Sequence, residues 1–241
     1  MSGGIGIKFS GSATIDGAVL FAPISLDIRP NKWTCLLGPS GVGKTTVLRE
    51  LAGLETAVEF DGVITVSDNK PLADRVAYMA QSDLLFPWLS VLENICIGAK
   101  LRSETIDIER AMRLLERVGL HEHHTKKPKA LSGGQRQRVA LARTLMEDRP
   151  VILLDEPFSA LDAKTRAEMQ ELSAELLVGK TVLLVTHDPA EAARLGHSVY
   201  VMEHDGLQTV DMPSAAPVRP VDDPETLTTQ GALFRILRGI A

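Results

Sequence analysis

The sequence predicts an α/β fold with a mostly parallel sheet and a helical insertion in the middle of the chain. Short apolar and β-branched runs alternate with longer amphipathic stretches, which is the pattern of βαβ units. The short runs carry little internal polarity, as strands covered on both faces do. From residue 82 to residue 150 the pattern changes to helical spacing. With 241 residues, 44% of them hydrophobic, the chain is long enough to bury such a core.

Bulk properties narrow the function classes. A formal net charge of −5 argues against general nucleic-acid affinity, because a surface that follows phosphates needs a basic excess. Cys35 and Cys96 form no CxxC and are flanked by apolar residues, so both are expected to be small buried hydrophobes in a reducing compartment. Residues 1–16 lack the charged and then apolar pattern of a secretory leader, so no such leader is expected. The longest apolar runs fall far below the ~18 residues of a membrane span, so a membrane role requires a partner.

The predicted elements follow in chain order. Buried strands are expected at residues 33–37, 76–79, 151–154 and 181–186. Helices are expected at residues 44–52, ended by a glycine, and at residues 109–118 and 134–146. Four prolines make residues 213–224 an extended connection, and a short amphipathic segment with Leu233, Phe234, Ile236 and Leu237 follows it.

A glycine-rich run lies between the first of these strands and the first helix. It matches GxxxxGK[ST], which in this context is a phosphate-binding loop. Glycines let successive backbone N–H groups point at phosphate oxygens, and the helix N-terminus adds partial positive charge. Lys44 is expected to reach the β- and γ-phosphates, and the Thr45 hydroxyl to ligate Mg²⁺. The predicted nucleotide-binding residues here are Gly38, Pro39, Ser40, Gly41, Val42, Gly43, Lys44, Thr45 and Thr46.

Two adjacent carboxylates, Asp155 and Glu156, follow the apolar run at residues 151–154. A strand end beside a phosphate loop is where an α/β sheet binds ligands. Asp155 suits Mg²⁺, and Glu156 suits a general base that polarises the attacking water. A solvated acidic turn is the alternative. A phosphate loop alone is shared with kinases and GTPases, but together with this acid pair it favours hydrolysis over group transfer.

A second glycine pair occurs in the run Leu-Ser-Gly-Gly-Gln-Arg-Gln-Arg at residues 131–138. Its serine is a good N-cap and its glycines leave N–H groups accessible, which makes a second anion-binding helix terminus. One nucleotide has a single γ-phosphate, and its own loop already surrounds much of it. The second terminus is therefore expected to serve a nucleotide held by another copy, through Ser132, Gly133, Gly134 and Gln135.

The run Leu-Ser-Gly-Gly-Gln resembles the signature of ABC transporter ATP-binding subunits, and the resemblance covers nearly the whole chain. The remaining elements of that family appear in the expected order. Gln81 resembles the Q-loop glutamine that senses Mg²⁺ and the partner interface. Asp162, in Ser-Ala-Leu-Asp, resembles the D-loop, and His187 resembles the switch histidine that contacts the γ-phosphate. Taken singly, the alternatives are a polar strand end, a helix cap and a core histidine.

The resemblance implies a RecA-like P-loop NTPase core with a mostly parallel sheet, an N-terminal antiparallel β region and a helical insertion. It implies one domain over residues 1–241. The α/β core is expected at residues 1–81 and 151–212, the helical signature subdomain at 82–150, and a C-terminal extension at 213–241.

The same resemblance implies that two copies sandwich two ATP molecules head to tail. Mg²⁺ is then held by Thr45, Gln81 and Asp155, and hydrolysis is carried by Glu156, His187 and Gln81. The other expected partners are integral membrane permease subunits and, indirectly, a substrate-binding protein, with no nucleic acid. The expected location is the cytoplasmic face of the bacterial inner membrane, where the permease holds the subunit.

One departure from the family concerns adenine, on which an aromatic residue, often tyrosine, usually stacks. The corresponding region, residues 9–15, has no tyrosine. Either Phe9 stacks on the base or Ile15 provides only an apolar contact. Weaker adenine selectivity is expected as a result.

The cargo is indicated only by relatedness. Phe-Pro-Trp-Leu-Ser-Val at residues 86–91 resembles the nitrate, sulfonate and taurine branch of importers. The runs at residues 33–44, 142–150 and 158–170 resemble the subgroup proposed to import hydroxymethylpyrimidine, a thiamine precursor. The pyrimidine is the favoured cargo, with sulfonate, taurine or nitrate as alternatives.

Two other interpretations fit the sequence less well. A soluble ABC ATPase of DNA repair or translation tends to carry long coiled-coil insertions or tandem ATPase units, whereas this chain has one phosphate loop, one signature and no long heptad run. The imidazoles of His121, His123 and His124 suggest a metal site, but nothing completes it, and a solvated loop is favoured. The lysines at residues 126–129 are interpreted as surface charge.

Overall fold

The computed structural model describes residues 4–239, so the ends of the predicted domain, residues 1–3 and 240–241, lie outside the described part. The chain forms two compact units. Unit 1 comprises Met1–Val76, Pro150–Asp155 and Val178–Ala241, and unit 2 comprises Ala77–Arg149 and Glu156–Leu177. The predicted subdomain boundaries and the separate extension at residues 213–241 stay predictions. No helix in residues 4–239 has the length and apolarity that crossing a bilayer requires.

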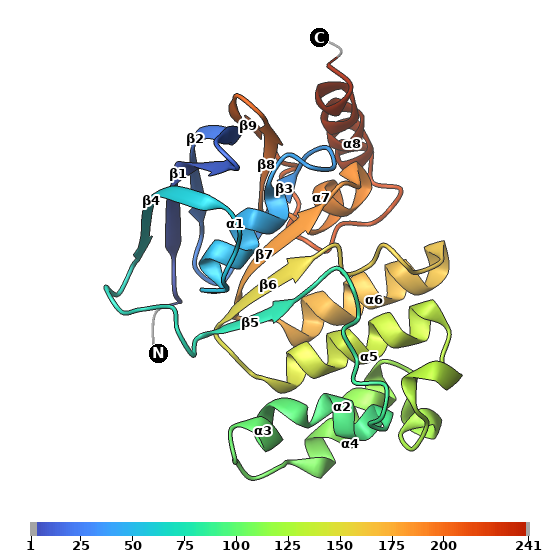
Figure 1. The fold of residues 1–241 in the computed structure, drawn as a ribbon. Coiled ribbons are helices and arrows are strands. Elements are labelled where there is room, and N and C mark those ends of the chain that lie inside the picture. Colours follow the sequence, from blue (N-terminus) through green and yellow to red (C-terminus); the bar gives the residue numbers. More distant parts are fainter. Residues whose placement is uncertain (1–3, 240–241) are drawn as a thin grey trace. The chain divides into compact units, whose positions relative to one another are not determined.

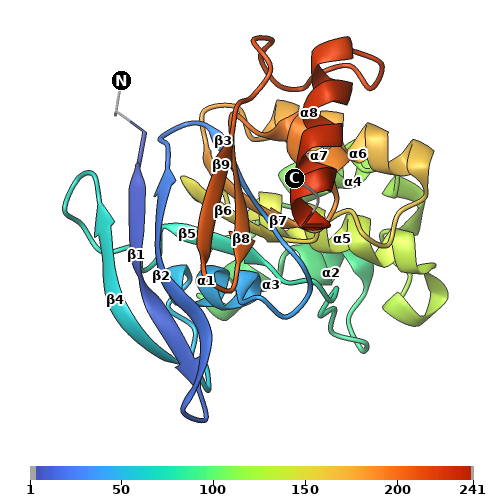
Figure 2. The ribbon, with the colours of Figure 1, turned by 90° about the horizontal axis from the view of Figure 1, so that it is seen from above.

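An antiparallel sheet occupies the N-terminal part of unit 1, as predicted. Its strands are β1 (Ile7–Ile15), β2 (Ala18–Ile28) and β4 (Glu59–Val66), in the order β2-β1-β4. Figure 2 shows the three strands side by side. The turn between β1 and β2 is Asp16-Gly17, with φ values of 50° and 77°, the left-handed pair that favours a tight hairpin.

The larger sheet carries the buried strands. These are β3 (Trp33–Leu37), β5 (Val76–Met79), β6 (Val151–Asp155), β7 (Thr181–Thr186), β8 (Ser198–Glu203) and β9 (Gly206–Val210). Their order in the sheet is β5-β6-β7-β3-β8-β9. Val76, the first residue of β5, is also the last residue of the first segment of unit 1. The pairs β3–β7, β3–β8 and β6–β7 are parallel, and β8–β9 is antiparallel. The mostly parallel sheet is thus confirmed, and every residue of β3, β6 and β7 is buried.

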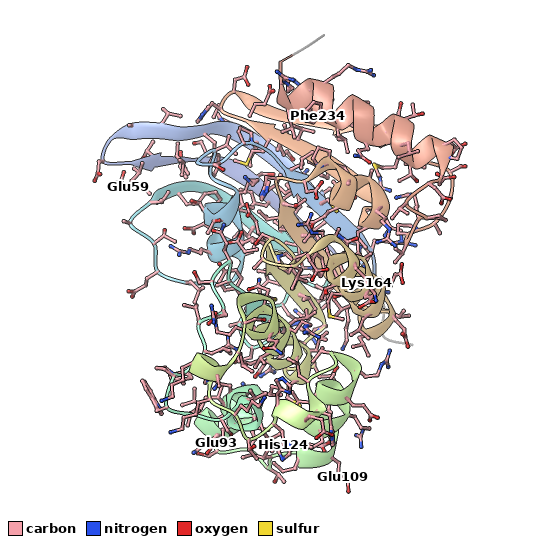
Figure 3. All side chains as sticks on the ribbon, turned by 90° about the vertical axis from the view of Figure 1, so that its right-hand side faces the viewer. Glu59, Glu93, Glu109, His124, Lys164 and Phe234 are labelled. Carbon is pink, nitrogen blue, oxygen red and sulfur yellow. The ribbon has the colours of Figure 1, made fainter. Side chains whose placement is uncertain are left out.

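Three helices accompany the sheets of unit 1. Helix α1 (Lys44–Leu51) contacts β6 and β7, and Gly53, with φ 65°, follows its end as predicted. Helix α7 (Pro189–Leu195) contacts β3, and α8 (Pro224–Leu237) packs on α7. Figure 1 shows β7 leading directly into α7. On α8, the half-exposed ring of Phe234 lies 5.7 Å from the guanidinium carbon of Arg238 (Figure 3).

The connection between β9 and α8 lacks regular structure, as expected, but it is anchored by a buried arginine. Arg219 is 2% exposed. Its guanidinium donates to the carbonyl oxygens of Ala193 at 2.7 Å and Gly196 at 2.8 Å, at the end of α7. A cation at a helix C-terminus satisfies carbonyl groups that have no partner within the helix. Arg219 therefore fixes the C-terminal segment of unit 1 to α7.

Unit 2 is helical. Its elements are α2 (Val91–Ile95), α3 (Ile97–Leu101), α4 (Ile108–Arg117), the 3-10 turns η1 (His121–His123) and η2 (Pro128–Ala130), α5 (Gly133–Met146) and α6 (Ala163–Leu176). Helices α2 and α4 both pack against α5. The backbone N–H groups of Val91 and Leu92 donate to the carbonyls of Lys126 and His124, which holds the segment carrying His124 beside the start of α2 (Figure 3).

Candidate functional site

Strand register brings the predicted phosphate loop, Asp155 and the predicted histidine to one edge of the large sheet. Leu37, the last residue of β3, pairs with Thr186, the last residue of β7. Asp155, the last residue of β6, pairs with Val185. The chain segments that follow the three strands therefore leave the sheet at the same edge. Carboxyl ends of parallel strands are where open α/β sheets bind ligands.

The loop at residues 38–43 connects β3 to α1, as predicted. Gly41 and Gly43 have φ values of 83° and 106°, in the left-handed region that favours glycine. A Cβ atom at Gly43 would lie 2.6 Å from a ring carbon of Phe21, so a larger residue does not fit there. Gly43 is the N-cap of α1 and makes no side-chain cap, so the first N–H groups of this helix depend on other acceptors.

Lys44 is the first residue of α1 and is 5% exposed. Its Nζ donates to the carbonyl oxygens of Gly38 at 2.9 Å and Pro39 at 2.8 Å. A buried ammonium is costly unless it is hydrogen-bonded, and these contacts hold it against the inner side of the loop. The charge is thus placed where the loop curls, as the predicted phosphate role requires.

Thr45 and Asp155 are brought together although 110 positions separate them. The Thr45 hydroxyl donates to Oδ2 of Asp155 at 2.9 Å, and Asp155 is 2% exposed. Hydroxyl and carboxylate oxygens are the hard ligands that Mg²⁺ prefers. The two side chains therefore fit the predicted magnesium site within unit 1.

Glu156 and Gln81 meet within unit 2. Nε2 of Gln81 donates to Oε2 of Glu156 at 3.1 Å. Glu156 has φ 49°, a left-handed conformation that few non-glycine residues adopt. Backbone strain of this kind often accompanies functional residues. The left-handed backbone conformation of Glu156 ends the extended backbone of β6, whose last residue is Asp155. The amide of Gln81 orients the carboxylate of Glu156.

His187 follows β7 and is exposed, so the alternative of a core histidine does not describe it. The residues on either side of it are hydrogen-bonded to each other, because the backbone N–H of Asp188 donates to the hydroxyl of Thr186 at 3.0 Å. His187 therefore lies at the edge of the sheet that also carries the phosphate loop, on a constrained turn.

The signature run forms the N-terminus of α5 in unit 2. Ser132 is its N-cap and forms a capping box with Gln135, since the Ser132 hydroxyl accepts from the Gln135 N–H at 3.2 Å. In return, Oε1 of Gln135 accepts from the Ser132 N–H at 2.9 Å. Gly133 and Gly134 form the first helical turn, and a Cβ at Gly134 would lie 3.3 Å from Leu161. The capping box confirms the predicted N-cap.

Asp162, the predicted D-loop residue, is the N-cap of α6. Its carboxylate accepts from the Thr165 N–H at 3.0 Å and from the Thr165 hydroxyl at 2.7 Å, which lowers the pKa of Asp162 below its ordinary value. These contacts are those of a helix cap, which is the alternative role named for Asp162 above. Its role towards a nucleotide stays a prediction.

One sequence-based alternative is wrong: Phe9 does not present a face to a base. Its side chain is 0% exposed and its ring stacks on that of Phe60, with centroids 4.8 Å apart. Phe9 occupies one of the buried positions of β1, in the antiparallel sheet. Ile15, at the end of β1, is 38% exposed and remains the apolar candidate.

Sequence reasoning missed a contact between the histidine run and the signature. Nε2 of His123 lies 3.1 Å from Nε2 of Gln135, whose Oε1 is already used by Ser132. The imidazole nitrogen is therefore the acceptor and the amide the donor. Within residues 4–239, no group of three histidine, cysteine or acidic side chains is arranged to hold a metal.

The segment after Gln81 exposes large apolar side chains. Leu84 is 63% and Trp88 65% exposed, and the rings of Phe86 and Trp88 lie 5.4 Å apart. Arg143 of α5 donates to the carbonyls of Asp83 and Leu84, at 2.8 and 2.9 Å, and so fixes this segment to α5. Exposed apolar patches of this kind mark interaction surfaces.

The family model and the relatives that match this chain belong to the same family. The family model described as ABC transporter matches residues 21–159. An uncharacterised ABC transporter ATP-binding protein of Haemophilus influenzae is 44% identical over 95% of this chain and 96% of its own length. The aliphatic sulfonates import ATP-binding protein SsuB of Delftia acidovorans is 39% identical over 94% of this chain and 91% of its own length.

A solved structure has the same fold. The dimeric post-hydrolysis state of the ATP-binding cassette MJ0796, bound to ADP and Pi, superposes with a TM-score of 0.75. It is 27% identical and covers 87% of this chain and 100% of its own.

Proposed function

This chain belongs to the ABC transporter family as an ATP-binding and ATP-hydrolysing subunit, and from that premise we propose that it energises an importer for a small solute. The single observation that carries the site is the 2.9 Å hydrogen bond from Thr45 to Asp155. It joins the phosphate loop to the strand-end carboxylate in a pair of hard oxygen ligands. Thr45 and Asp155 would hold Mg²⁺, which would neutralise the negative charge that develops on the phosphate.

Hydrolysis is assigned to Glu156 as the general base. A base must lie within hydrogen-bond reach of the proton that it takes, in a fixed orientation. The amide of Gln81 donates to one carboxylate oxygen of Glu156 and so fixes the orientation of the carboxylate. His187 is assigned to the γ-phosphate, and Gln81 also to Mg²⁺, as the family resemblance implies.

A second copy of the chain is the proposed partner at the signature. Ser132, Gly133, Gly134 and Gln135 then bind the nucleotide of the opposite copy through a capped helix terminus. The dimeric post-hydrolysis state of the MJ0796 cassette supports this arrangement. Permease subunits are the proposed partners of the apolar segment around Trp88. Binding to the permease would hold the chain at the membrane as a peripheral subunit.

The cargo that we propose is an aliphatic sulfonate, because several relatives are named as aliphatic sulfonates import ATP-binding proteins. Relatives of that name from Delftia acidovorans and Agrobacterium fabrum are 39% and 46% identical to this chain. The resemblance of three framework runs to hydroxymethylpyrimidine importers favours the second candidate. Uptake of each labelled solute by native-host cells that lack this gene, with and without the wild-type chain, distinguishes the two. Restored uptake of one solute alone identifies the cargo.

The first prediction concerns Glu156→Gln. Removing the base while keeping the side-chain shape should lower kcat by about 100-fold or more, and ATP affinity should stay within about twofold. Steady-state ATPase assays and equilibrium ATP binding measure the two effects. Glu168→Gln, an exposed carboxylate of α6, is the matched control and should leave both unchanged. Rapid turnover by Glu156→Gln would remove Glu156 from the role of base.

The same variant tests the transporter assignment. Glu156→Gln purified from gently solubilised host membranes with Mg-ATP should bring a polytopic membrane protein with it. Lys44→Ala, which loses the phosphate-binding ammonium, should bring less. Recovery of soluble ribosomal or DNA-repair proteins instead would favour the soluble ABC ATPase.

A further inference from the structure

Helix α7 carries a buried carboxylate that the site described above does not use. Glu191, four residues after His187, is 4% exposed. Its Oε2 accepts a hydrogen bond from the Thr186 hydroxyl at 2.7 Å, and Thr186 is itself 2% exposed. A buried carboxylate is costly unless hydrogen bonds satisfy it. This pair therefore has one strongly preferred geometry.

The hydroxyl of Thr186 is both a hydrogen-bond donor and a hydrogen-bond acceptor. It donates to Glu191, and it accepts from the backbone N–H of Asp188 at 3.0 Å. Because a hydroxyl has one proton, donation to the carboxylate directs its lone pairs towards Asp188. Asp188 is fixed in turn, since its Oδ1 caps α7 by accepting from the Ala190 N–H at 2.8 Å.

These hydrogen bonds fix the residues on both sides of His187. Thr186 precedes His187, Asp188 follows it, and both are held by one hydroxyl whose orientation Glu191 sets. Thr186 is also held from the other side, because it pairs with Leu37, the last residue before the phosphate loop. The backbone of His187 is thus tied to the sheet and to α7, while its side chain remains exposed.

We propose that Glu191 is a positioning residue for His187: through the Thr186 hydroxyl it fixes the turn that aims the imidazole at the γ-phosphate. The proposal rests on the proposed ATPase function and names a residue that acts through another. Glu191 is buried, and its carboxylate acts through the Thr186 hydroxyl. A purely structural role, as an anchor for the start of α7, is the rival explanation.

The test compares three substitutions in the full chain. Glu191→Met removes the acceptor at similar volume, and Thr186→Val removes the hydroxyl while keeping the β-branched shape. Each should lower kcat by about 10-fold through misplacement of His187, with the Kd for ATP within about twofold. Glu191→Gln keeps an amide oxygen that can accept from Thr186, and it should retain at least about half of kcat.

A double-mutant cycle separates positioning from structure. His187→Ala should lower kcat, and adding Glu191→Met or Thr186→Val to it should lower kcat no further, because the group that they position is gone. Losses that multiply would overturn the proposal, as would an unchanged kcat in His187→Ala. Thr186→Val answers the question if Glu191→Met does not fold. A wild-type chain that binds ATP without hydrolysing it would overturn the proposed function instead.

Discussion

Glu156 combines two backbone constraints that favour its assignment. It adopts φ 49° and it precedes Pro157, and a residue before proline already avoids the right-handed helical region. A non-glycine residue in a left-handed conformation costs about 1–3 kcal/mol. The chain tolerates this cost where it separates Asp155, buried in β6, from a carboxylate that must stay accessible.

His197 gives the second prediction, on pH. Burial, with the charges of Lys32 and Arg219, lowers the pKa of His197 to about 4. Its Nδ1 accepts from the Trp33 N–H at 3.1 Å, so the folded state needs the neutral ring. Between pH ~4 and ~6.5 the unfolded chain binds a proton that the folded chain does not, so stability falls as pH falls through this window.

Urea unfolding near pH 7 and near pH 4.5 measures this loss. His197→Asn keeps an oxygen that accepts from the Trp33 N–H but does not titrate, so the pH dependence should be shallower. An equal slope in the variant would show that His197 contributes nothing to it. Above pH ~6.5 its contribution should be constant.

At the scale of elements, helix α4 gives the third prediction. Asp107 is its N-cap, and the carboxylate accepts from the Arg110 N–H at 2.8 Å. Asp107→Ala removes one of the few acceptors for the first turn and should lower the free energy of unfolding by about 1 kcal/mol. Asp107→Asn, which retains a capping oxygen, should lose much less. Urea unfolding followed by circular dichroism measures both, and equal losses would contradict capping as the cause.

Elements with a strong local pattern were predictable, and others were not. β3 and β7 were predicted with their observed bounds, and α4 and α5 within one residue, because apolar runs and helical spacing mark them. Helix α6 gives a weak signal, because two of its four buried residues, Gln170 and Ser173, are polar. Helix α7 has seven residues, too few to show periodicity.

The site was predictable where a local motif encodes it. The meeting of Thr45 and Asp155 follows from the rule that parallel strands share a carboxyl edge. The pair Phe9–Phe60 was not foreseeable, because burial of Phe9 depends on a strand about fifty positions away. The His123–Gln135 contact depends on a 3-10 turn that no periodicity predicts.

At the scale of the whole molecule, the fourth prediction concerns association. Glu156→Gln should dimerise with ATP, and Ser132→Arg, which blocks the signature terminus with a large cation, should bind ATP as a monomer. Light scattering with and without ATP measures both. Mixing Ser132→Arg with Lys44→Ala should restore at most one composite site per dimer. Two fully active sites in that mixture would contradict binding of one nucleotide by two copies.

The hydrogen bond from the Val151 N–H to the Arg75 carbonyl, 3.2 Å long, has a consequence for how such a chain can evolve. The long helical segment of unit 2 leaves unit 1 after Val76 and re-enters it at Pro150, so its two ends are anchored at adjoining points. The entropy of closing a loop grows only logarithmically, by about 0.6 kcal/mol for each doubling of length. Insertions and deletions in the loops of this segment therefore cost the sheet little, and a new docking partner can be acquired without redesigning the strands that hold the phosphate loop.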